Sequence, residues 1–201
     1  QPRLVVADVL TLRTLPVREF RSGLAEVVKH AMIADQELFR ILEEDADRIL
    51  ERDPPTLQAI IGRNCAIKAR VVEADEREAG MRAVLNFGHT VGHAVEAAAG
   101  YGTITHGEAV AYGMLVATAL SVRRGLCPPA DASRLERLLR RFNLVPRACF
   151  SPELVEKYIV RDKKMRDGVL QFVLTPGVGS VTLAPISDWM DLREALHDLQ
   201  V

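Results

Sequence analysis

The fold is decided by the stretch RAVLNFGHTVGH at residues 82–93. Its alanine-rich continuation reaches Ala99 and stops at Gly100, which predicts a helix that ends at a glycine. Within that helix His89 and His93 are four residues apart, so both imidazole rings leave the same face. The two rings can therefore converge on one ion or one substrate group.

A third histidine lies just downstream, at the start of the next helix. Thr105-His106-Gly107-Glu108 has the form of a capping box and precedes an apolar run, which places His106 in the first helical turn. A catalytic zinc ion takes three ligands from histidine and carboxylate side chains and leaves one position open. The spacing alone also allows the simpler interpretation that these are ordinary core or surface histidines.

The pattern does not select the carboxylate that such a metal site would need. Glu26, on a helix predicted to begin near Leu15, is one candidate. Other glutamates are as near in the sequence: Glu73, Glu78, Glu96 and Glu108.

The remaining pattern predicts one compact, predominantly α-helical unit with a small β-hairpin. Expected helices cover residues 15–32, 36–50, 56–75, 106–119, 130–142 and 152–160 and the segment from residue 188 onward. Strands are expected at residues 169–174 and 180–183, turned by Pro176-Gly177. The apolar residues 4–8 read as a further strand.

Composition excludes several classes of protein. The chain has 26 Lys and Arg against 27 Asp and Glu, a net charge of −1, so no nucleic acid or acidic membrane is expected as a partner. Its three cysteines form no C-x-x-C pair, which favours a reducing compartment and hence the cytoplasm. No apolar run approaches the roughly 20 residues of a membrane span.

Four motifs resemble the dehydroquinate synthase family of sugar-phosphate cyclases. They are REFRSGLAEVVKH at residues 18–30, LNFGHTVGH at 85–93, HGEAVAYGM at 106–114 and DKK at 162–164. Their order and spacing are highly specific, and the resemblance covers nearly the whole chain.

The resemblance implies a metal site. Glu26, His89 and His106 match the family's three ligands, normally to zinc, with cobalt as an alternative. His93 matches a histidine that faces the substrate phosphate rather than the ion. Spacing alone would have assigned both His89 and His93 to the metal.

The resemblance also implies two anion clamps. Lys29 and Asn86 match residues near the substrate phosphate, and Lys68 and Arg82 match residues that grip its carboxylate. Separated cationic groups suit a substrate with two anionic ends. Further active-site positions are matched by Glu78 and by one of Lys163 and Lys164, without an indication of which lysine.

By the same resemblance, residues 15–201 form the helical metal- and substrate-binding C-terminal domain of the family fold. Residues 1–14 would be a strand and linker of an upstream Rossmann-like domain, missing here, that binds NAD. The glycine-rich dinucleotide fingerprint is absent, since Gly177-Val-Gly179 reads as a hairpin turn. The implied reaction converts 3-deoxy-D-arabino-heptulosonate 7-phosphate to 3-dehydroquinate in a homodimer, and the fragment alone is expected to be inactive.

Three other interpretations stay open at this stage. The chain could belong to another sugar-phosphate cyclase, to an iron-containing alcohol dehydrogenase, or to a non-catalytic binding module on the same fold. Lys68, Arg82 and Asn86 discriminate among the enzymes, because they suit a substrate that carries both a carboxylate and a phosphate.

Overall fold

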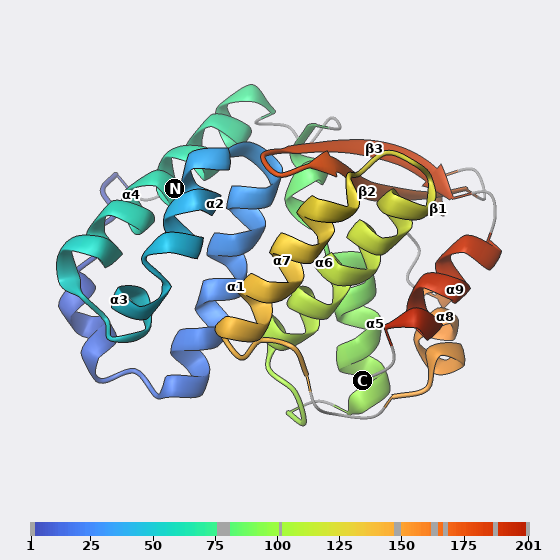
Figure 1. Ribbon diagram of the computed structural model, residues 1–201, viewed down its shortest axis with the longest axis horizontal. Helices are drawn as coiled ribbons and strands as arrows, with labels where there is room; N and C mark the ends of the chain where they lie inside the picture. The colour runs from blue at the N-terminus through green and yellow to red at the C-terminus, as the bar shows by residue number, and fades with distance from the viewer. Residues whose placement is uncertain are drawn as a thin grey trace.

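The computed structural model describes residues 3–75, 81–100, 102–146, 150–161, 165–166, 169–186 and 189–199. Its helices gather into a bundle, and a small sheet lies across one side of it (Figure 1). The α-helices are α1 Val17–Ala34, α2 Gln36–Glu44, α3 Ala46–Leu50, α4 Pro54–Ala74, α5 His89–Ala99, α6 His106–Arg123, α7 Pro129–Arg141, α8 Pro152–Arg161 and α9 Trp189–Asp198. Two 3-10 helices, η1 Val9–Arg13 and η2 Met81–Asn86, and three strands, β1 Met165–Arg166, β2 Val169–Gly177 and β3 Ser180–Ile186, complete the described elements. The predicted fold class, mainly α with a small hairpin, is confirmed.

Helix α6 forms the centre of the core. Thirteen of its eighteen residues are buried. A helix that is apolar on all sides must be covered on all sides, and α6 packs against α1, α5, α7, α9 and β2. The start of this helix therefore has a fixed place relative to α1 and α5.

The predicted capping box sets the first residue of α6. The Thr105 hydroxyl accepts a hydrogen bond from the Glu108 backbone N–H at 3.2 Å, and the Glu108 carboxylate accepts one from the Thr105 N–H at 2.6 Å. These bonds satisfy two backbone donors that the helix itself leaves free. His106 is consequently held in the first turn, as expected.

Glycines let α5 and α6 approach backbone to backbone. A Cβ built on Gly113 of α6 would lie 1.9 Å from the Gly88 carbonyl oxygen, and one built on Gly92 of α5 would lie 3.2 Å from the carbonyl of Ala109. Gly88 also adopts a φ of +78°, which favours glycine. This contact brings the histidines of α5 beside the N-terminus of α6.

The hairpin forms where it was predicted, but its turn is displaced. Gly177 pairs with Ser180, so the turn residues are Val178 and Gly179, and Pro176 lies within β2. The register is irregular between Leu174 and Gly177. A proline has no N–H to give to the ladder, which explains the irregularity there.

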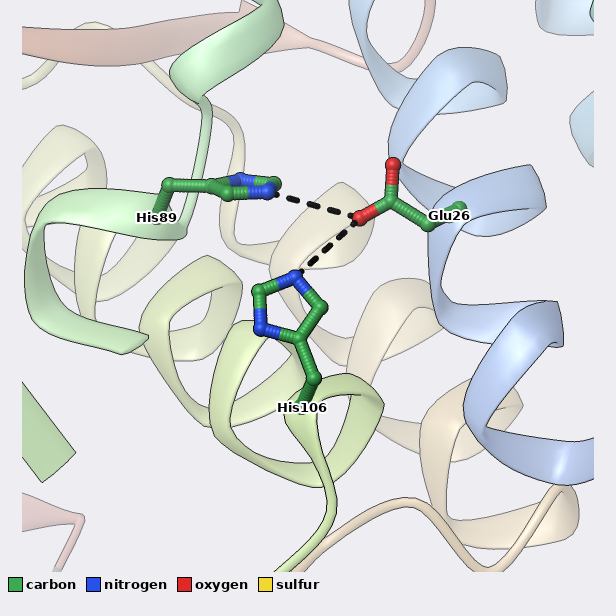
Figure 2. A group of neighbouring side chains, drawn as sticks. All are labelled: Glu26, His89 and His106. Carbon is green, nitrogen blue, oxygen red and sulfur yellow. Dashed lines mark ion pairs between the residues drawn. The ribbon is translucent and has the colours of Figure 1, made fainter. Parts of the chain in front are cut away.

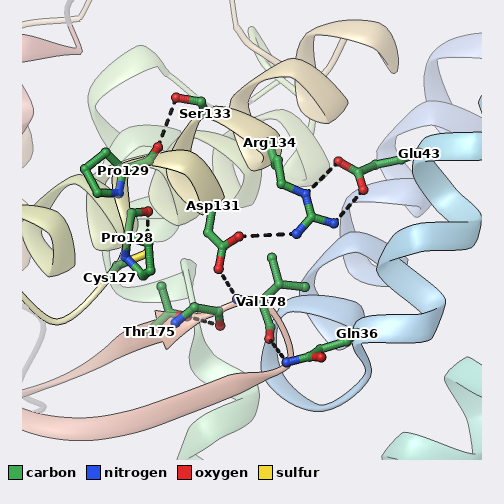
Figure 3. A network of polar contacts seen from close by, with 11 residues as sticks. Gln36, Glu43, Cys127, Pro128, Pro129, Asp131, Ser133, Arg134, Thr175 and Val178 are labelled. Carbon is green, nitrogen blue, oxygen red and sulfur yellow. Dashed lines mark hydrogen bonds and ion pairs between the residues drawn. The ribbon is translucent and has the colours of Figure 1, made fainter.

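Side chains of two helices hold that turn (Figure 3). The Val178 carbonyl accepts a hydrogen bond from the Gln36 amide at 3.0 Å, and the Val178 N–H donates to the Asp131 carboxylate at 3.2 Å. Asp131 also pairs with Arg134, which in turn binds Glu43 of α2 at 2.6 Å. The sheet is thereby fixed to α2 and α7.

The strand expected at residues 4–8 is not formed. These residues have no regular structure, and Leu4, Val5 and Val6 are 77–79% exposed. An extended segment becomes a strand only where a neighbour accepts and donates its backbone hydrogen bonds, and the described sheet contains β1, β2 and β3 alone. The chain instead forms η1, whose first turn is capped by Asp8.

The single helix expected at residues 36–50 is divided in two. Asp45, with φ −98° and ψ 19°, leaves the helical conformation between α2 and α3. The break lets Ala46 and Ile49 of α3 reach the core, where both are fully buried.

Among the described residues, no helix is long and apolar enough to cross a membrane.

Candidate metal centre

Three side chains from separate helices meet at one point (Figure 2). Glu26 lies in α1, His89 is the first residue of α5 and His106 is the first residue of α6. The Nε2 atoms of His89 and His106 lie 3.4 Å and 3.9 Å from the same carboxylate oxygen, Glu26 Oε1. One ligand atom from each residue falls within 4.8 Å of the other two.

The surroundings of Glu26 Oε1, which lies between the two imidazole rings, favour a bound cation. Glu26 Oε1 is buried, and within the described part of the chain it has no hydrogen-bond partner. A buried carboxylate oxygen left unsatisfied is costly. A divalent ion would satisfy it, and one carboxylate with two imidazoles is a typical donor set for catalytic zinc that leaves a position open. The residues present therefore fit such an ion.

His89 and His106 each use the ring nitrogen that points away from Glu26, Nδ1, for a hydrogen bond. His89 Nδ1 lies 3.3 Å from the carbonyl oxygen of Phe87, and His106 Nδ1 lies 3.2 Å from Glu96 Oε2. A proton on Nδ1 leaves the lone pair on Nε2, the atom that faces Glu26. Both rings are thus presented in the form that a metal requires.

The electrostatics keep His89 neutral. Burial lowers the pKa of His89 to about 4, with a further contribution from the positive charge of Lys29 and an opposing one from Glu26. Burial by itself would raise the pKa of Glu26, but the charge and hydrogen bond of Lys29 outweigh it and hold that pKa below its usual value. A neutral imidazole and an ionised carboxylate are the states that bind a cation.

Lys29 binds the second oxygen of the Glu26 carboxylate, Oε2. Its Nζ lies 2.6 Å from Glu26 Oε2, and its side chain is only 5% exposed. Burial lowers the pKa of Lys29, and the nearby charge of Lys68 lowers it further, while Glu26 opposes both. The lysine fixes the carboxylate so that Oε1 faces the two histidines.

His93 lies beside the three residues but not among them. Its ring centroid is 5.6 Å from that of His89 and 6.0 Å from that of His106. It belongs to a second, more exposed group with Glu96 and His106, whose ligand atoms also lie within 4.8 Å of one another. His93 therefore lies outside the group of Glu26, His89 and His106, and its assignment to the substrate phosphate stays a prediction.

The residues expected to bind the carboxylate and phosphate lie on neighbouring elements. Arg82 and Asn86 are half-buried in η2, which packs against α1 and α4. The Arg82 backbone N–H donates to the buried carboxylate of Asp75 at 2.9 Å, which ties η2 to the end of α4. Lys68 is exposed on α4, near enough to influence Lys29. Their contacts with a substrate stay predictions.

Glu78, Lys163 and Lys164 lie outside the described residues. Among the other glutamates considered from the sequence, Glu73 is exposed and Glu108 caps α6. Glu96, by contrast, contacts His106, a role that was not foreseen. The spacing His-x-x-x-His-x-x-Glu, which places Glu96 two turns after His89 on one face, is the signal that could have found it.

Comparison with known proteins identifies the family of this chain. The profile of the family described as 3-dehydroquinate synthase C-terminal matches residues 23–165. The 3-dehydroquinate synthase of Pelobacter propionicus is 48% identical over 191 residues, which cover 93% of this chain and 52% of the relative. That of Geobacter metallireducens is 51% identical over 189 residues, covering 94% of this chain and 52% of the relative. The chain thus spans about half the length of the curated relatives it matches.

Two solved structures have the same fold. The 2-epi-5-epi-valiolone synthase of Streptomyces hygroscopicus subsp. jinggangensis 5008, solved with NAD+ and Zn2+ bound, superposes with a TM-score of 0.86 at 29% identity, over 96% of this chain and 54% of that one. A 2-deoxy-scyllo-inosose synthase complexed with carbaglucose-6-phosphate, NAD+ and Co2+ gives 0.86 at 28% identity, over 98% and 57%. The family match over residues 23–165, together with the cluster of Glu26, His89 and His106, leads to one conclusion: this chain belongs to the 3-dehydroquinate synthase C-terminal family.

Proposed function

We propose that this chain is the metal- and substrate-binding half of a 3-dehydroquinate synthase. The enzyme would convert 3-deoxy-D-arabino-heptulosonate 7-phosphate to 3-dehydroquinate and phosphate, a carbon–oxygen lyase step of the shikimate pathway. The observation that carries the proposal is the meeting of Glu26, His89 and His106 around one buried carboxylate oxygen. The curated relatives of that name, 48% and 51% identical, support this substrate over those of the cyclase structures at 28–29%.

The proposed cofactors are a divalent ion, zinc or cobalt, and NAD. The related cyclase structures contain NAD+ with Zn2+ or with Co2+. Glu26, His89 and His106 would hold the ion, which, when bound, polarises the substrate hydroxyl that is oxidised. We place the main NAD site in an upstream nucleotide-binding domain, with residues 1–14 as the connection to it. The assembled enzyme is proposed to be a cytoplasmic homodimer.

The side chains around the cluster would then position the substrate. Lys29, His93 and Asn86 are assigned to the phosphate, and Lys68 and Arg82 to the carboxylate. Oxidation of the ring hydroxyl, with NAD+ as the hydride acceptor, would acidify the neighbouring C–H bond. The substrate phosphate would then take that proton and leave, while Lys29 and His93 hold the phosphate in place. The protein would then contribute chiefly by orienting the substrate. Two separate groups of side chains would bind its two anionic ends, the phosphate and the carboxylate.

Another cyclase, an alcohol dehydrogenase and a binding module remain the competing functions. Lys68 and Arg82 favour a substrate with a carboxylate, which a cyclase acting on a neutral sugar phosphate would not need. The buried Lys29 beside Glu26 favours a site built for a ligand over a module that only retains the fold.

The test is a coupled assay of phosphate release, with metal analysis, on this chain together with its nucleotide-binding domain. His106→Ala should lose the bound metal and lower phosphate release about a hundredfold or more. The matched control is His197→Ala, since that imidazole is 44% exposed and pairs only loosely with Glu153, at 3.6 Å. Phosphate release in His106→Ala equal to that of the control would refute the proposal.

A further inference from the structure

We infer that Glu96 is a positioning residue for the metal centre: it holds His106 in the tautomer and orientation that direct Nε2 toward Glu26. The inference rests on the proposed function, because it concerns the same ion site. It gives a new role to a residue that the sequence offered only as one of several candidate carboxylate ligands and to which the family resemblance gave none.

The contacts of His106 divide between its two ring nitrogens. Nδ1 lies 3.2 Å from Glu96 Oε2, and Nε2 lies 3.9 Å from Glu26 Oε1. A neutral imidazole carries one proton, and an ionised carboxylate can only accept a hydrogen bond. Glu96 therefore keeps the proton on Nδ1 and leaves the Nε2 lone pair directed into the centre.

His106 has greater need of such a partner than His89 has. The His89 side chain is 14% exposed and its Nδ1 is placed near the Phe87 carbonyl, whereas the His106 side chain is 46% exposed. An exposed ring at the first position of a helix is otherwise free to rotate and to exchange tautomers. A metal-bound histidine usually donates its second N–H to a carboxylate or a carbonyl, and the two histidines here use one of each.

The fold places Glu96 beside His106. It lies two helical turns beyond His89 on α5, so it follows the face that carries His89 and His93. The glycine contacts between α5 and α6 bring that face against the first turn of α6. The Glu96 side chain is 21% exposed, and partial burial strengthens its charge-assisted bond to the ring.

A different role for Glu96 would be that of a direct ligand. His93, Glu96 and His106 form the second group whose ligand atoms lie within 4.8 Å. If His106 bound an ion through Nδ1 in that arrangement, it could not also donate a proton from Nδ1 to Glu96. The ring would then leave the hydrogen bond in which it is found, which is why we assign Glu96 the positioning role.

The experiment compares Glu96→Ala and Glu96→Gln with Glu136→Ala in this chain. Glu136 is the matched control because it is a partly exposed helical glutamate, with a 42% exposed side chain, whose ion pair is with Arg140, within α7. Zinc affinity is measured by competition with a chromophoric chelator, and circular dichroism verifies folding. Glu96→Ala should weaken zinc binding about 10–100-fold at unchanged stoichiometry, and Glu96→Gln, which keeps an acceptor, should recover part of the loss.

Nitrogen NMR of the imidazole rings provides a readout that does not depend on metal. In the zinc-free chain, His106 should carry its proton on Nδ1, and Glu96→Ala should shift the population toward the Nε2-protonated form. Unchanged tautomer and unchanged zinc affinity would overturn the inference, as would loss of a second zinc equivalent with the first unaffected. If the unaltered chain bound no zinc, the proposed function would fail, while the tautomer measurement would still decide the role of Glu96.

Discussion

Gly107 of α6 lies against the backbone of Ser22 in α1, so closely that a Cβ at Gly107 would fall 2.2 Å from the Ser22 carbonyl oxygen. The Gly107 N–H also donates to the Ser22 hydroxyl at 3.0 Å. Gly107 follows His106, and Ser22 precedes Glu26 by about one helical turn. The distance between Glu26 and His106, two of the proposed metal ligands, is therefore set by a contact between backbones that leaves no room for a side chain at Gly107.

Gly107→Ala should disturb that distance. The added methyl group meets backbone atoms, which cannot rotate away, so α1 and α6 must separate. Overpacking of this kind costs about 1–3 kcal/mol of stability, and zinc affinity should fall with it because Glu26 and His106 move apart. Urea denaturation and a zinc titration measure the two effects.

Gly23→Ala is the control, since nothing lies within 4 Å of a Cβ at that position of α1. It should stabilise the helix by about 0.5–1 kcal/mol and leave zinc binding unchanged. Equal stability and equal affinity in Gly107→Ala and the unaltered chain would mean that the helices adjust without cost, contrary to this account.

His89→Ala and His93→Ala should separate the two histidines that sequence spacing groups together. The Nε2 of His89 faces the buried oxygen of Glu26, so its loss should abolish stoichiometric zinc binding. His93 is outside that group, and its loss should change zinc affinity by less than about threefold while weakening the binding of inorganic phosphate. Isothermal titration with each ligand distinguishes the two variants, and a similar loss of zinc in both would show that His93 is a ligand.

Asp35 should make stability depend on pH. Its carboxylate accepts bonds from Arg63 at 3.0 Å and 3.1 Å and from the Leu38 N–H at 2.9 Å. Burial alone would raise the pKa of Asp35, but the bonds from Arg63 and from the start of α2 outweigh it, and the pKa lies below its usual value. Because the folded pKa is lower than that of the unfolded chain, about 3.9, the stabilisation is present above that pH and is lost as pH falls through the folded pKa.

Asp35→Asn should therefore be less stable than the unaltered chain by about 1–2 kcal/mol at pH 7. The difference should shrink as the pH falls below about 4, the pKa of aspartate in the unfolded chain, and onward through the lower pKa of the folded carboxylate. Urea denaturation across this range measures the trend. Asp47→Asn, at an exposed residue that pairs with Arg141, is the matched control and should show little effect at any pH. A stability gap that stayed constant with pH would contradict the assignment.

The local sequence pattern predicted most of the helices and strands. It also predicted one helix boundary, the start of α6, in atomic detail. The start of α6 was predicted because the Thr105–Glu108 capping box is a bond between residues three apart, which the sequence specifies without reference to the rest of the chain. The break at Asp45 and the absent strand at residues 4–8 were not predicted, because each depends on what packs alongside. Propensity describes a segment and not its neighbours.

The sequence by itself determined which residue types could bind a metal and which helices carry them, and the family resemblance selected Glu26 from several glutamates as the proposed carboxylate ligand. Only the tertiary structure decided that Glu26 Oε1 is buried between two Nε2 atoms, that Lys29 holds the other oxygen and that Glu96 lies on His106. The physical reason is that these relationships join α1, α5 and α6 across long sequence separations. Their distances are fixed by close helix packing at Gly107 and Gly113, which no periodicity along one chain segment encodes.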